Sequence, residues 1–143
     1  CSTLGVLISG DMMLPRISTN VGAHPSTPDG NPLGLFLESI ARLRELPADT
    51  LVLPSHGKPF RGLHQRIEQL EVHHAERCAL LVEACAEPRT ASDLLPVLFE
   101  RPLFDAHQIF FALAEAIAHL NFLVACGRLT REIKQTVFHY HRI

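Results

Sequence analysis

Two short apolar runs stop abruptly at small residues, and each is followed by a side chain that can bind a metal ion. Residues 4–9 lead through a glycine to Asp11, and residues 50–53 lead to His56, which lies between a serine and a glycine. Continuous apolar runs of this length are typical of buried strands, and strand ends hold the side chains that follow them rigidly. We therefore expect Asp11 and His56 at one edge of a sheet.

The segment between these runs indicates how the two strands pair. Residues 12–30 are irregular, and Asn31 and Pro32 are typical of a helix start, with apolar residues repeating at helical spacing until Pro47. Strand, helix and strand in this order form a crossover unit, which pairs its strands in parallel. Two strands alone cannot make a covered sheet, so we expect residues 1–61 to be the end of a larger sheet domain. The alternatives are strands borrowed from a partner, or a chain that is only a fragment.

Residues 62–143 predict a second, α+β domain. Residues 62–86 form a long helix, because apolar and small residues recur at spacings of three and four along one face: Leu63, Ile67, Leu70, His74, Cys78, Leu81 and Cys85. A short helix begins at Thr90 and breaks at Arg101-Pro102, and a third runs from Asp105 to Gly127, with its buried face at Ile109, Leu113, Ala116, Leu120 and Leu123. Strands at 129–131 and 136–140 follow. Three helices and a hairpin are the order of a winged helix.

Composition excludes some functions. Hydrophobic residues make up 47% of the 143 residues and the net charge is -2, which gives no electrostatic basis for binding nucleic acid or an anionic membrane. We find no apolar run of transmembrane length. The four cysteines, Cys1, Cys78, Cys85 and Cys126, form no CxxC pair. We expect reduced thiols in a cytoplasmic protein.

Asp11 and His56 also have simpler structural interpretations. Alone, Asp11 would be a turn or helix cap and His56 a structural histidine. Together, at the same ends of parallel strands, they favour a shared metal site. A catalytic zinc needs three protein ligands, so the remaining ligands must come from elsewhere. We expect His74 to be a core histidine, His119 to pair with Glu115 on one helix face, and His24 to be a loop residue that could line a pocket.

The winged-helix order raises the question of nucleic acid. The third helix carries Asp105 and Glu115 and contains no lysine or arginine. An element that contacts phosphates needs cations. We therefore interpret residues 62–143 as a packing or substrate-capping domain.

Several motifs then resemble one known family. They are Ile8–Pro15, Ile17–Val21, Asn31–Leu33 and Leu43–Gly57, followed by His73-His74, Thr90–Leu94 and Ala118–Asn121. The whole chain is similar to the C-terminal half of a metallo-β-lactamase superfamily hydrolase of the glyoxalase-II-like and β-lactamase-like-protein-2-like branch. The later motifs resemble the winged-helix domain appended in that branch.

The resemblance implies an α/β fold, the C-terminal part of an αββα sandwich followed by the winged helix. It implies a centre of two metal ions, usually zinc, with Asp11 bridging both and His56 on the second, acting on a small ester or thioester. The metal-ligand motif His-x-His-x-Asp-His is absent from these residues, so we expect this chain to be inactive alone. Ser55 replaces the usual glycine before the histidine. The alternatives are a nuclease of the same superfamily and a non-catalytic interaction module, and a homodimer would cover the exposed sheet edge.

Overall fold

The computed structural model describes residues 2–99 and 105–143, which divide into two compact units. The first unit comprises Cys1–Thr19 and Leu35–His73, and the second comprises Asn20–Gly34 and His74–Ile143. The break expected at residues 101–102 lies outside the described residues, as does Cys1. The domain boundary that we expect after residue 61 stays a prediction.

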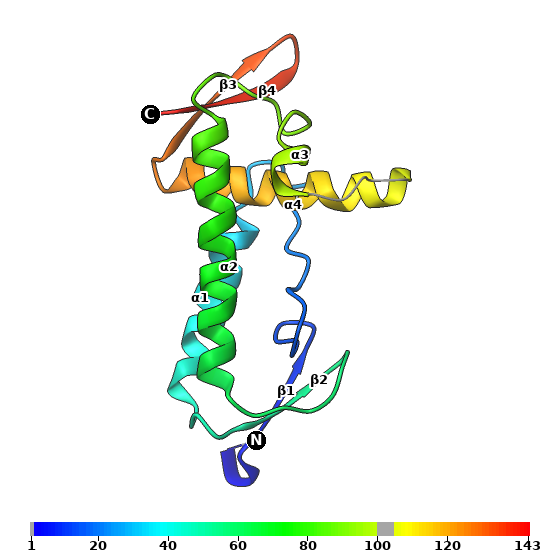
Figure 1. Cartoon of the computed structure of the whole chain (residues 1–143), viewed down its shortest axis with the longest axis vertical. Coiled ribbons are helices and arrows are strands. Elements are labelled where there is room, and N and C mark those ends of the chain that lie inside the picture. The colour runs from blue at the N-terminus through cyan, green and yellow to red at the C-terminus, as the bar shows by residue number, and fades with distance from the viewer. Residues whose placement is uncertain (1, 100–104) are drawn as a thin grey trace. The chain divides into compact units, whose positions relative to one another are not determined.

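The first unit is built around a parallel pair of strands, which lie side by side in Figure 1. β1 (Val6–Gly10) pairs with β2 (Leu51–Pro54), with Val6 opposite Leu51 and Gly10 opposite Pro54. A short helix, η1 (Ser2–Leu4), precedes β1, while α1 (Pro32–Arg42) and η2 (Leu43–Glu45) connect the strands. The crossover unit and its parallel pairing are confirmed.

One face of this pair packs on an apolar core and the other is open. The core comprises Met13, Ile40, Val52, Leu63, Ile67 and Leu70, with Leu7, Phe36 and Phe60 among the residues packed against it. Our expectation of fully buried strands is wrong, since Ile8 in the middle of β1 is 80% exposed. Among the described residues no third strand joins this sheet. A two-stranded sheet has too little covering structure to bury both of its faces.

The long helix α2 (Leu63–Ala84) confirms the predicted periodicity. All seven residues of the expected buried face are at most 2% exposed: Leu63, Ile67, Leu70, His74, Cys78, Leu81 and Cys85. The helix has residues in both units, and its first half contributes three side chains to the core of the first. Spacing alone therefore identified the buried face, because every turn of the helix repeats it.

The second unit contains α3 (Leu95–Leu98), α4 (Ala106–Ala125) and a hairpin of β3 (Leu129–Lys134) and β4 (Val137–Arg142). The Thr90–Asp93 pair forms the expected reciprocal hydrogen bonds, but it closes a turn, and the helix begins only at Leu95. Asp105 caps α4 through the backbone N–H of Gln108, at 2.7 Å. Arg89 makes an isolated antiparallel bridge with Tyr140 of β4.

The buried face of α4 differs in part from the prediction. Ala116, Leu120 and Leu123 are fully buried, but Ile109 in the first turns of the helix is 39% exposed. Among the described helices α4 alone has the length and apolar composition of a membrane span, contrary to the expectation that no apolar run reaches that length. A core helix of a folded domain has the same composition, so these properties do not distinguish the two cases.

Two polar pairs lie inside the second unit. The rings of His74 and His119 are buried, with Nδ1 of His74 and Nε2 of His119 3.0 Å apart. Nδ1 of His119 lies 2.8 Å from the backbone carbonyl of Glu115. The expected local pair of His119 with Glu115 therefore forms through the backbone carbonyl of Glu115. The Glu115 carboxylate instead lies 3.6 Å from Arg77, whose charge opposes the rise in pKa that burial gives this carboxyl.

Burial predicts which thiols react. Burial raises the pKa of Cys78 to about 11 and also raises the pKa of Cys85, whereas Cys126 is exposed. Because the thiolate is the nucleophile, iodoacetamide at pH 8 should alkylate Cys126 and leave Cys78 and Cys85 unmodified in the folded chain. Peptide mass mapping before and after unfolding in guanidinium measures this. Equal native labelling of Cys78 and Cys126 would contradict the buried packing of α2.

Candidate metal centre

The parallel register brings Asp11 and His56 to one edge of the sheet. β1 ends at Gly10, β2 ends at Pro54, and the backbone N–H of Ser55 donates to the carbonyl of Gly10 at 3.0 Å. The residues that follow the two strands are therefore neighbours, and Asp11 Oδ1 lies 3.6 Å from His56 Nε2. The sequence predicted this juxtaposition of two residues that are 45 positions apart in the chain.

The separation fits two ligands of one ion. Zinc binds histidine nitrogen and carboxylate oxygen at about 2.0–2.2 Å, so two ligands at a tetrahedral angle lie roughly 3.4 Å apart. The observed 3.6 Å is close to that value. Both side chains are accessible, with 62% of the Asp11 side chain and 72% of the His56 side chain exposed. Among the described residues, however, no group of three or more His, Cys, Asp or Glu side chains could hold a metal ion.

The hydroxyl of Ser55 lies next to this pair. Oγ of Ser55 donates to Oδ1 of Asp11, the same oxygen that faces His56. The hydroxyl of Thr19 donates to the backbone carbonyl of Asp11. These bonds orient the carboxylate and its peptide. In the sequence Ser55 stands out only because it replaces the family's usual glycine, and spacing along the chain does not predict that its side chain reaches Asp11.

The loop after Asp11 is fastened to α2 by one arginine. Nε of Arg66 donates to the carbonyl of Leu14 at 2.7 Å, and Nη2 donates to the carbonyl of Ile17 at 2.9 Å. Met13, in the same loop, is fully buried in the apolar core. The loop is therefore fixed by both apolar packing and hydrogen bonds, which positions the side chains that it presents beside His56.

The other histidines do not complete the site. His74 and His119 pair with each other in the second unit, as described above. His24 lines a largely apolar cavity of about 520 Å³ within that unit, and its Nδ1 lies 2.7 Å from the Ser26 hydroxyl. The expected loop position of His24 is confirmed, since the residue is exposed and lies outside any helix or strand, and the cavity that it lines does not include Asp11.

Comparisons with known proteins show which proteins the chain is similar to. Residues 78–143 match the family described as the metallo-beta-lactamase-like, C-terminal domain. This part of the chain is therefore similar in sequence to such domains. A search of curated proteins found no match to the chain.

Solved structures extend the similarity to almost the whole chain. A beta-lactamase domain protein from Burkholderia ambifaria is 51% identical, with a TM-score of 0.95 over 99% of this chain. A metallo-beta-lactamase family protein from Thermus thermophilus is 35% identical, with a TM-score of 0.83 over 99% of the chain. The chain spans 42% and 43% of the lengths of these two proteins. Together, these matches make the chain similar to the C-terminal part of metallo-β-lactamase-like proteins.

Gly57 is a specific test of the turn that carries His56. Its φ is +87°, and a Cβ at this position would lie 2.7 Å from Cγ of Pro15. Gly57→Ala should therefore destabilise the chain by about 1–3 kcal/mol through backbone strain, with a further contribution from the clash. Urea unfolding followed by circular dichroism measures the loss.

Gly5→Ala is the matched control. Gly5 has φ of +60°, but nothing lies within 4 Å of the position of its added Cβ. Gly5→Ala should introduce backbone strain but no clash with a neighbouring residue. The Gly57→Ala variant, which also clashes with Pro15, should therefore be the less stable of the two. Equal stabilities would show that the approach of Pro15 to Gly57 does not constrain the turn.

Proposed function

We propose that this chain contributes Asp11 and His56 to the two-zinc centre of a metal-dependent hydrolase that cleaves small esters or thioesters. The observation that carries the proposal is the 3.6 Å separation of the Asp11 carboxylate and the His56 imidazole at the ends of paired strands. The similarity to metallo-β-lactamase-like proteins over 99% of the chain supports it. The remaining ligands would come from residues outside these 143.

The roles of the chain's own residues follow from the geometry. Asp11 and His56 would hold metal ions, with Ser55 orienting the carboxylate through its hydrogen bond. Bound zinc would supply Lewis acidity and a water of lowered pKa. Because the ligand side chains are more than half exposed, other parts of the protein and the substrate can approach them. Two ligands leave such a centre incomplete, so the chain alone would be inactive.

We infer that the second unit is a winged helix that packs against or caps the substrate site of the complete protein. The element order of helices and an antiparallel hairpin supports this, as does the bridge of Arg89 to Tyr140, which adds an extended segment beside β4. α4, the helix in the recognition position, contains no lysine or arginine. That composition disfavours the alternative of a nuclease, which needs cations to contact phosphates.

Zinc content tests the incomplete ligand set. After dialysis the 143-residue chain should retain less than about a tenth of an equivalent of zinc, since two exposed ligands bind it weakly. Elemental analysis with intact mass measures this. In a longer natural protein that includes the missing ligands, Asp11→Asn and His56→Ala should each lower both zinc content and hydrolysis, whereas Asp29→Asn, in the second unit, should change neither. Stable retention of one or two equivalents by the short chain, or full zinc content in both ligand variants, would contradict the proposal.

A further inference from the structure

A cavity beside His56 is lined by cations. It has a volume of about 460 Å³ and lies within the first unit. Its lining includes Arg16 from the loop after β1 and Lys58 from the turn after β2. Among the described residues no aspartate or glutamate lines it. The chain as a whole has 15 acidic and 13 basic side chains, so a wall with two cations and no acid differs from the average surface.

A second cavity that Arg16 lines also contains basic side chains. A neighbouring cavity of about 330 Å³ is also lined by Arg16, together with Arg66 and His73, and again no acidic residue lines it among the described residues. Arg66 is engaged by its bonds to Leu14, Ile17 and Gln69. Arg66 therefore fixes the loop that follows β1. Arg16 is exposed and shows no hydrogen bond or ion pair in the described part of the chain.

The rest of the wall beside His56 is apolar. Pro15, Ile17, Pro59 and Phe60 line the same cavity as the two cations. Gly57 approaches Pro15 closely, which joins the two loops that carry these residues. A ligand that fits such a wall has a compact anionic group next to an apolar part. Arginine presents a planar fork to carboxylate or phosphate, and lysine presents a point charge.

We propose that Arg16 and Lys58 bind an oxyanion, a carboxylate or phosphate, on the small-molecule ester or thioester that is cleaved at the Asp11–His56 centre. The inference rests on the proposed function for the location of the reacting bond, and it adds the substrate's charge. Both cations are exposed, so each contributes modest affinity, and together they raise the local concentration of anionic substrates. Both line the cavity that contains His56, so the anionic group would lie near the bond that is cleaved.

Anion binding is tested on the 143-residue chain without metal. In EDTA and at low salt, inorganic phosphate and, separately, acetate are titrated against the ¹⁵N-labelled chain. Amide shifts at residues 16–18, 56–58 and 60 should saturate, and the Arg16→Gln/Lys58→Gln double variant should lose about tenfold in affinity for at least one of the two anions. Preference for one anion assigns the carboxylate or phosphate source. Circular dichroism and the unchanged amide spectrum of the second unit confirm that the variant is folded.

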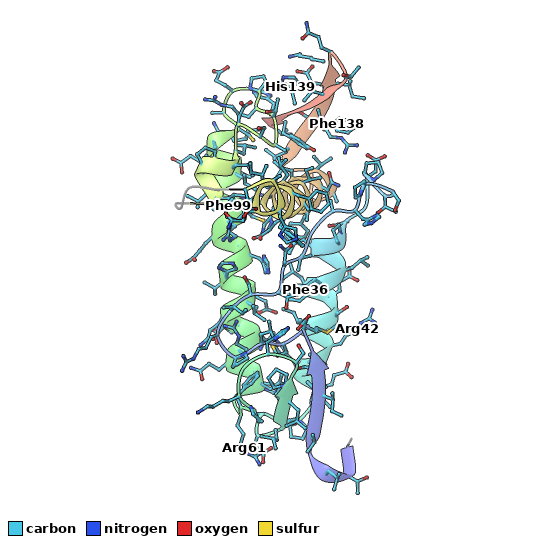
Figure 2. All side chains as sticks on the ribbon, turned by 90° about the vertical axis from the view of Figure 1, so that its right-hand side faces the viewer. Phe36, Arg42, Arg61, Phe99, Phe138 and His139 are labelled. Carbon is cyan, nitrogen blue, oxygen red and sulfur yellow. The ribbon has the colours of Figure 1, made fainter. Side chains whose placement is uncertain are left out.

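Arg42→Gln is the matched control. Arg42, labelled in Figure 2, ends α1 in the same unit, is exposed and lines neither cavity. It should bind both anions as the parent chain does. If Arg42→Gln weakens binding as much as the double variant, or if no saturable shift occurs near Arg16 and Lys58, the proposal is overturned. Tight binding of single-stranded RNA through Arg16 and Lys58, far above that of phosphate, would also overturn it in favour of nucleic acid.

Activity separates this inference from the proposed function. In an active longer protein, the double variant should lower the ratio of kcat/KM for a carboxylate-bearing ester to that for a neutral ester by about tenfold, chiefly through KM. Asp11→Asn should lower zinc content and the hydrolysis of both esters. An unchanged ratio with Asp11→Asn less active would reject only the anion site. Retained zinc and activity in Asp11→Asn would reject only the metal role, because the phosphate titration needs no metal.

Discussion

The parallel pairing of β1 with β2 is the interaction on which the candidate centre depends. It joins segments 45 residues apart, and the hydrogen bond from Ser55 to Gly10 continues the pairing beyond the last residue of β2. A shift of register would separate Asp11 from His56, because successive side chains on a strand point to opposite faces. The apolar core beneath the strands opposes such a shift, since Val52 is completely buried in the present register. Burial of apolar side chains thus fixes the distance between two exposed polar groups.

The sequence predicted regular elements well because periodicity is repeated many times within them. α2 repeats its buried face over six turns, and all seven predicted positions are buried. Prediction failed where burial depends on neighbours that are distant in sequence. Ile8 has the composition of a core residue but lies on the open face of a two-stranded sheet. Ile109 fits the helical spacing of α4 but lies near its first turn and is 39% exposed.

Side-chain partners were harder to predict than positions. Glu115 and His119 have the i, i+4 spacing of a helix pair, yet the carboxylate lies near Arg77 and the ring contacts His74. A carbonyl can only accept, so in the neutral rings Nδ1 of His119 carries the proton toward Glu115, and its Nε2 accepts from His74. The Arg77–Glu115 and His74–His119 contacts both join polar side chains of α2 to polar side chains of α4. Spacing within one helix contains no information about them.

The part of the chain that matches the C-terminal domain family and the part that carries the candidate chemistry do not coincide. The match covers residues 78–143, whereas Asp11, His56 and both cations of the proposed anion site precede residue 78. The structural relatives cover both parts. A metal role for the first unit therefore rests on strand-end geometry and on the whole-chain similarity, and the domain match by itself does not support it. Arg16 and Lys58 are also difficult to recognise from the sequence. They are 42 positions apart, and only the fold places both around one cavity.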